Sequence, residues 1–209
     1  MPPRVSDSTL EQFRQATAGQ QPTPAGVAVA AASATFALGL LVKVLTVSGR
    51  RQELAPSLPR LESLAAAALE ASKRMLQLAG DDIAAFDAYL TARRMPRATD
   101  SERAAREQRT HSAVRRAIDV PLAAAQEAAA GLQLCSEMSA TTPPALAADL
   151  GVGAALLASA LRGFLLCAES NIRQLASDGA SYRERLAADT KRYEQALRQA
   201  EAVLASIRP

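Results

Sequence analysis

Asp82 is the residue of this sequence best placed for acid or base chemistry. Its segment predicts a helix, and the residues three and four positions away are apolar: Leu78, Ala79, Ala85 and Phe86. A carboxylate among apolar side chains has a raised pKa unless a cation or hydrogen-bond donors meet it, which suits general acid or base catalysis. A structural alternative stays open, in which this carboxylate forms an ion pair with Lys43, Arg50 or Arg51 and ties two helices together.

Further polar side chains interrupt segments that are otherwise apolar. Lys43 lies near the end of an apolar helix, where its ammonium group can reach solvent while its stem stays buried. Asp149 follows a pair of prolines and precedes a helix, so its side chain can cap the first turn. Asn171 lies in another apolar segment, where a buried amide needs hydrogen-bond partners. Each of these side chains therefore has a structural interpretation beside a functional one.

The ligands of a transition-metal site are missing from the pattern. His111 is the single histidine, and it lies in a charged segment that is typical of a solvated helix face. Without Cys/His spacing or a second histidine, we expect no metal centre and no Ser-His-Asp triad. Cys135 and Cys167 are too few for a disulfide framework, and we interpret both as small core residues.

Residues 25 to 42 contain no charged side chain, so we expect this segment to be buried away from water. A membrane span needs about 20 strongly apolar residues, whereas this stretch is mostly alanine with glycine, serine and threonine interspersed. It lacks the GxGxxG and Walker patterns of nucleotide folds, and no strand precedes it. A helix with small side chains all round suits the centre of a bundle. We therefore expect a buried core helix rather than a membrane span.

The rest of the chain shows helical periodicity interrupted by prolines. Ser8 should cap a first helix that turns Leu10 and Phe13 inward. Pro96 should end one helix, and Pro121 should kink another or break it in two. The expected segments are 8–18, a core helix between Thr23-Pro24 and a connection at 47–57, then 59–94, 99–139, 146–176 and 181–207.

Composition supports the same fold class. Alanine is abundant, aromatic residues make up 3% of the chain and tryptophan is absent, which favours close-packed helices over strands. We expect an all-α bundle of about five to six helices, two of them buried and Ala-rich. The prediction is one domain over residues 1–209, with 1–7 disordered. Two small-sided helices are hard to cover from one chain, so we also expect a homodimer.

The net charge of +3 is mild and suits a small anionic ligand better than a nucleic acid, which usually meets a concentrated basic stripe. Residues 1 to 21 are polar and lack the apolar core of a signal peptide. The expected compartment is therefore the cytoplasm, with neither a nucleic acid nor a membrane as partner.

Six segments occur in an order that one family shows. Together they resemble the formiminotransferase-cyclodeaminase C-terminal domain family, which includes bacterial methenyltetrahydrofolate cyclohydrolases. The resemblance runs from about residue 10 to the C-terminus, and its specificity lies in the ordered set rather than in any single motif. The segments are "TPAGVAVAA", "LTVSGRR", "DDIAAFDAYLTARRMP", "AIDVPLAAAQEAA", "ADLGVGAALLASALRGFLL" and "ESNIRQL".

The resemblance implies a dimeric helical domain with a tetrahydrofolate derivative as substrate and no metal or redox cofactor. The implied reaction is hydrolysis of 5,10-methenyltetrahydrofolate to 10-formyltetrahydrofolate, or loss of ammonia from 5-formiminotetrahydrofolate. Matching positions imply catalytic roles for Asp82 and Asp149, and Arg50 and Arg51 would bind the folate's glutamate carboxylates. The residues expected to bind substrate are Pro24, Gly26, Lys43, Arg50, Arg51, Gly151 and Asn171.

Departures from the family pattern fall at the implied site. The family's P-G-G-G-S loop is P-A-G-V-A here (24–28), and Val27 would crowd a close approach of backbone to ligand. Arginines at 50 and 51 replace family lysines, and arginine cannot give up a proton at working pH. An alternative is therefore a divergent paralogue with lost or altered catalysis, which binds a folate-like anion or a partner protein.

Overall fold

The computed structural model describes residues 5–175 and 179–207, and in these ranges the chain is helical without strands. This confirms the predicted all-α bundle. Residues 1–4 of the segment expected to be disordered lie outside the described residues, whereas 5–7 form a short 3-10 helix. The elements are η1 (Val5–Asp7), α1 (Leu10–Thr17), α2 (Gly26–Ser48), η2 (Gln52–Ser57), α3 (Leu58–Arg93), α4 (Asp100–Ser139), η3 (Pro144–Leu146), α5 (Ala147–Ile172) and α6 (Gly179–Ile207).

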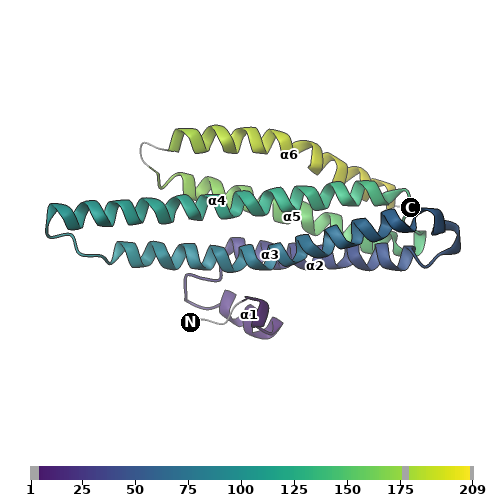
Figure 1. Ribbon diagram of the computed structural model, residues 1–209, viewed down its shortest axis with the longest axis horizontal. Coiled ribbons are helices and arrows are strands. Elements are labelled where there is room, and N and C mark those ends of the chain that lie inside the picture. Colours follow the sequence, from purple (N-terminus) through teal and green to yellow (C-terminus); the bar gives the residue numbers. More distant parts are fainter. Residues whose placement is uncertain (1–4, 176–178, 208–209) are drawn as a thin grey trace.

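Four helices form the centre of the bundle and close a ring. Helix α2 packs on α3 and α5, and α4 packs on the same two helices from the other side. Helix α6 covers α4 and α5, while the short helix α1 lies apart on the outer side of the bundle (Figure 1). Close approach of α2 and α5 depends on small residues, because a Cβ at Gly153 would lie 3.1 Å from a methyl group of Leu41.

Helices α2 and α5 are the apolar core helices that the sequence predicts, yet each keeps an exposed apolar face. Phe36 on α2 is 55% exposed, and Leu166 on α5 is 66% exposed. By length and composition alone both helices could cross a membrane, and about half of each apolar stretch is buried inside the bundle. Core helices of soluble proteins also have these properties, so length and composition do not decide what covers the two faces.

Most helix boundaries fall within a few residues of the predicted ones, but the first helix differs in detail. Its N-cap is Thr9 rather than Ser8: the Thr9 hydroxyl accepts from the Gln12 amide, and the Gln12 side chain accepts from the Thr9 amide. This reciprocal capping box fixes the start one residue later than predicted. Leu10 therefore points outward and is 70% exposed, while Phe13 packs against the core.

The ring contains helices of very unequal length. Helix α3 has 36 residues and α4 has 40, whereas α2 has 23 and α5 has 26. At about 1.5 Å per residue, the α3–α4 hairpin extends well past the start of α2 and the end of α5. The hairpin projects at one end of the molecule (Figure 1). The bundle thus has a step where the two short helices stop and the two long helices continue.

Helix α4 runs unbroken through Pro121, so the predicted break is wrong. Proline has no N–H, and the carbonyl of Ala117, four residues earlier, loses its usual partner in the helix. The side chain of Asn171 on α5 supplies the missing donor, because its amide nitrogen lies 2.7 Å from that carbonyl oxygen. One side-chain hydrogen bond therefore compensates the proline and joins α4 to α5 near the step.

Replacing Asn171 should reveal this compensation. Asn171→Ala leaves the Ala117 carbonyl without a partner in a partly buried place, and should lower the free energy of unfolding by about 1–3 kcal/mol. Urea denaturation followed by circular dichroism measures the change. In a Pro121→Ala background the helix regains an N–H for this carbonyl, so the same substitution should cost clearly less. An equal cost in both backgrounds would contradict this explanation.

Candidate functional site

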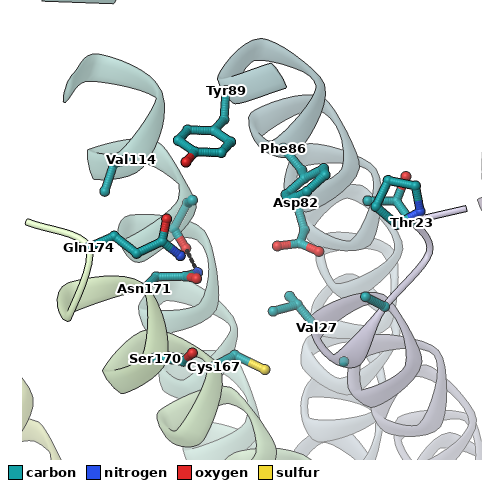
Figure 2. Close-up of a pocket in the computed structure, with 14 residues that line it drawn as sticks. Thr23, Val27, Asp82, Phe86, Tyr89, Val114, Cys167, Ser170, Asn171 and Gln174 are labelled. Atoms are coloured by element: carbon teal, nitrogen blue, oxygen red, sulfur yellow. Dashed lines mark hydrogen bonds between the residues drawn. The ribbon is translucent and has the colours of Figure 1, made fainter. Parts of the chain in front are cut away.

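A cavity of about 220 Å³ opens at the step in the bundle. Four helices contribute to it: the start of α2, the last third of α3, the middle of α4 and the end of α5. Residues that are far apart in the sequence therefore line one cavity (Figure 2). The lining side chains include Thr23, Val27, Asp82, Phe86, Tyr89, Val114, Cys167, Ser170, Asn171 and Gln174.

Asp82 projects from α3 into this cavity (Figure 2). Burial raises the pKa of Asp82 from 3.8 to about 6, and burial is the sole cause, since no cation contributes. The carboxyl group is therefore protonated below about pH 6 and ionised above it. A group that changes its charge near neutral pH can both accept and return a proton during one reaction.

The wall opposite Asp82 is formed by the last turns of α5. Asn171 is held by its hydrogen bond to Ala117, and its side-chain oxygen has no partner among the described residues, so it can accept a hydrogen bond from a ligand. Burial, and secondarily the charge of Asp82, raises the pKa of the Cys167 thiol. This thiol therefore stays protonated, which argues against a role as nucleophile.

The start of α2 forms a third side of the cavity. Gly26 lies close to α5, because a Cβ there would be 3.1 Å from the Cys167 sulfur. Ala25 at the N-cap offers no side-chain acceptor, so the first amide groups of the helix have no side-chain cap. Val27 is buried and turns toward the same space (Figure 2). The amides offer hydrogen-bond donors, and the valine narrows the cavity beside them.

Aromatic rings flank Asp82 along α3. Phe86 and Tyr89 lie one and two turns further on, with ring centroids 6.1 Å apart and planes tilted by 43°. Together with Val114 from α4 they give the cavity an apolar side suited to a flat heterocycle. The site thus combines an acid/base group, an amide, free helix N–H groups and aromatic surface.

The structure brings only some of the predicted site residues together. Asp82, Gly26 and Asn171 meet in the cavity, while Pro24 lines a neighbouring groove between α2 and α5. Asp149, expected to be catalytic, instead pairs with Lys43: their charged atoms are 2.6 Å apart on the outside of α2 and α5. That pair is 22 residues from Asn171 along α5, a separation of about 33 Å.

The remaining predicted residues lie at the far end of the bundle. Gly151 is buried against α6, where a Cβ would meet Ile207 at 3.0 Å, so its small size serves packing. Arg50 and Arg51 follow the end of α2, about 36 Å from Gly26 along a helix of this length. Arg51 pairs with Glu53 at 2.7 Å. The ion pair considered for Asp82 with Lys43, Arg50 or Arg51 is therefore not formed within the chain.

Several lining residues were not predicted from the sequence. Phe86 follows Asp82 by four residues and Tyr89 follows Phe86 by three. This spacing predicts that all three lie on one face of α3. Cys167 and Ser170 share a face of α5 with Asn171 in the same way, and Gln174 follows in the turn after the helix. Both helix faces could be predicted from the sequence, but nothing in the sequence showed that the face of α3 lies opposite the face of α5. Among the described residues no cluster of three or more metal-ligating side chains occurs.

Comparison with known proteins identifies the family. A family model described as Formiminotransferase-cyclodeaminase matches residues 9–200. The chain belongs to this family. Among curated proteins it is 27% identical to methenyltetrahydrofolate cyclohydrolase of Methylorubrum extorquens over 182 residues, which covers 87% of each chain. It is 30% identical to formimidoyltransferase-cyclodeaminase of Sus scrofa over 183 residues, 85% of this chain but 33% of that longer protein.

The fold of the family is also found in a solved structure. Formiminotetrahydrofolate cyclodeaminase from Thermotoga maritima superposes with a TM-score of 0.84 and covers 97% of this chain and 98% of the other. The sequence identity is 18%, so this likeness shows the shared fold alone. The family and the all-helical architecture expected from the sequence are both confirmed.

The raised pKa of Asp82 predicts how stability depends on pH. The folded protein holds this proton more tightly than the unfolded chain, so the folded state is favoured below about pH 4 and loses that advantage as the pH rises through about 6. Asp82→Asn cannot ionise and should raise the free energy of unfolding at pH 8 by on the order of 2–3 kcal/mol. Urea denaturation at pH 8 and at pH 4 measures both effects, and the difference should vanish at the lower pH.

Proposed function

We propose that this chain is a folate-dependent one-carbon enzyme, and specifically a methenyltetrahydrofolate cyclohydrolase. The observation that carries the proposal is Asp82, a carboxyl group with a pKa of about 6 in a cavity with aromatic and amide walls. The similarity to the Methylorubrum extorquens enzyme over 87% of both chains supports the choice of reaction. A folate would lie with its bridge near Asp82 and with its aromatic rings against Phe86 and Tyr89.

The chemistry needs one group that moves a proton. In the ionised state Asp82 takes a proton from water as the water oxygen bonds to the bridge carbon of 5,10-methenyltetrahydrofolate. Collapse of the adduct breaks the bond from that carbon to the ring nitrogen N5, and Asp82 returns its proton to N5. The hydroxyl of the adduct loses its proton to solvent as the formyl C=O bond forms, so one proton is released per turnover. The product is 10-formyltetrahydrofolate, and the carboxylate is regenerated. Neither a metal nor a redox cofactor is part of this proposed sequence.

The lack of a protein cation beside Asp82 fits this substrate. The methenyl bridge is an amidinium cation, so the substrate itself brings the positive charge that the cavity lacks. Burial makes the ionised carboxylate unfavourable, so a nearby positive charge stabilises it more than it would stabilise a carboxylate in water. The free amides at the start of α2 would donate hydrogen bonds to acceptor atoms of the pteridine, and the Asn171 oxygen would accept from its N–H groups.

Loss of ammonia from 5-formiminotetrahydrofolate is the second candidate reaction. In that reaction N10 bonds to the formimino carbon and loses its proton, and the formimino nitrogen is protonated and leaves this carbon as ammonia. An acid/base group such as Asp82 is needed at the same carbon, and the similarity to the Sus scrofa protein supports this candidate. A divergent, non-catalytic folate-binding protein is the third possibility, and the position of Val27 in the cavity wall favours it. Tight binding of the methenyl compound without turnover would identify this third case.

Activity should depend on Asp82 and not on its neighbour. The purified protein should accelerate the loss of the near-ultraviolet absorbance of 5,10-methenyltetrahydrofolate, and Asp82→Asn should reduce kcat by at least about a hundredfold. Because the ionised carboxylate is the base, kcat/KM should rise with pH and level off above about 6.

The adjacent residue provides a matched control. Asp81 lies on the same turn but pairs with Arg116 on α4, with 3.0 Å between the charged atoms. Asp81→Asn removes the same charge without touching the cavity and should leave kcat within about threefold of the unmodified protein, since exposed ion pairs contribute little. A protein that gives no acceleration over the uncatalysed reaction would rule out the cyclohydrolase, and one that also forms no methenyl absorbance from 5-formiminotetrahydrofolate would rule out both enzymatic candidates.

A homodimer through the exposed faces of α2 and α5 completes the proposal. Along α2 the residues Val29, Ser33, Phe36 and Leu40 recur at intervals of four and three, and they form one stripe without charge. A groove of about 570 Å³ between α2 and α5 is lined by small residues of both helices, including Ser159 and Gly163. A second copy of the chain would bury this surface, and lipid is the alternative that the experiment must exclude.

One charge in the stripe should separate the subunits. Phe36→Asp places a carboxylate at a residue that is 55% exposed in the single chain, and should convert the dimer to a monomer in light scattering after size exclusion. Leu69→Asp is the control, because Leu69 is 49% exposed on α3, outside the stripe. A monomeric unmodified protein, or one that needs detergent to stay in solution, would contradict the proposed dimer. The cytoplasmic location stays a prediction, which cell fractionation tests.

A further inference from the structure

A second cavity of about 410 Å³ lies on the projecting α3–α4 hairpin. It is lined by four arginines and one acidic residue, Glu107, so its charge is strongly positive. Val114 and Gln174 line both this cavity and the one that holds Asp82. The two spaces are therefore neighbours that share a boundary. The arginines are Arg93, Arg97, Arg103 and Arg106.

The helix periodicity aligns the two cavities. On α3, Asp82, Phe86, Tyr89 and Arg93 follow at intervals of four, three and four, and so lie on one face. On α4, the residues Ala117, Val114, Thr110, Arg106 and Arg103 follow at intervals of three, four, four and three in the opposite direction, and so also lie on one face. Each face changes from apolar at the cavity of Asp82 to basic at the tip of the hairpin.

Most of the basic side chains are available to a ligand. Within residues 5–175 and 179–207, Arg93, Arg97 and Arg106 have no carboxylate partner. Arg103 is committed, since it pairs with Asp100 and donates to the carbonyls of Arg97 and Ala98 at 3.2 and 2.9 Å. Arg93, Arg97 and Arg106 thus line one pocket in which Glu107 is the single acidic residue among those described, and guanidinium groups without a carboxylate partner can bind the carboxylates of a ligand.

We propose that this arginine pocket binds the carboxylates of the folate's glutamate tail, with the pteridine in the cavity of Asp82. The proposal rests on the proposed function, because that function places a pteridine beside Asp82. It moves the tail-binding role from Arg50 and Arg51, at the far end of α2, to Arg93, Arg97 and Arg106.

The dimensions of the site agree with this assignment. The cavity of Asp82 holds about 220 Å³, less than the roughly 300–1,000 Å³ of sites that enclose a whole ligand. It therefore suits the pteridine head, and the rest of the molecule must leave it. Asp82 and Arg93 are 11 residues apart on α3, which is about 16 Å along the helix. An elongated ligand with an aromatic head and an anionic end matches this separation.

Equilibrium binding tests the proposal without requiring turnover. Titration calorimetry under reducing conditions compares the Kd of tetrahydrofolate monoglutamate with that of the triglutamate. The triglutamate should bind about three- to tenfold more tightly, because added carboxylates meet exposed guanidinium groups. In Arg97→Ala/Arg106→Ala this preference should fall to about one. Salt at about 0.5 M should weaken the triglutamate more than the monoglutamate.

A matched variant controls for the loss of charge. Arg109→Ala/Arg192→Ala also removes two exposed arginines, but neither residue lines the two cavities, and the preference for the triglutamate should persist. Equal affinity of the unmodified protein for both folates, or a preference that survives in Arg97→Ala/Arg106→Ala, would overturn the proposal.

The outcome is separable from that of the proposed function. Turnover of the methenyl compound with no preference for the longer tail would leave the function standing and remove the arginine pocket from it. A preference that depends on Arg97 and Arg106, in a protein without turnover, would support the pocket and reject the catalytic role of Asp82.

Discussion

The unequal length of paired helices is the constraint on which the site depends. In a ring of four helices of equal length, the inward-facing side chains would pack the centre closely and leave no cavity. Here α2 begins and α5 ends part-way along α3 and α4. Side chains from all four helices line the cavity that results. The packed half of the bundle fixes these side chains, so the cavity is held by rigid elements rather than by loops.

The second constraint is electrostatic. Asp82 lies where no protein cation meets it, and burial therefore makes its ionised form unfavourable. Elsewhere the acidic residues behave differently: Asp149 pairs with Lys43, Asp81 with Arg116 and Glu127 with Arg74. The protein thus compensates the carboxylates that join helices, and leaves uncompensated the carboxylate in the cavity. Such a contrast is typical of functional sites, where stability is given up locally for reactivity.

The sequence predicted the architecture well because helices leave strong local signals. Periodicity, prolines and composition gave the helix segments and the all-α class, and the ordered motifs gave the family. The site was predicted less completely. Asp82, Gly26 and Asn171 line the candidate cavity, whereas Lys43, Asp149, Arg50 and Arg51 lie far from it. Sequence order does not say which ends of long helices meet, and a shift along a helix axis of 20 residues amounts to about 30 Å.

The hydrogen bond from Asn171 to Ala117 changes how related sequences should be read. Wherever a proline occupies the position of Pro121, an asparagine at 171 stabilises the fold, and it would persist after catalysis had been lost. Asp82 is the opposite case, because it weakens the fold at neutral pH and has no structural partner to retain it. In related proteins that have lost catalysis, mutation should therefore replace Asp82 before Asn171. The presence of the aspartate is thus the more informative sign that a related protein is an active enzyme.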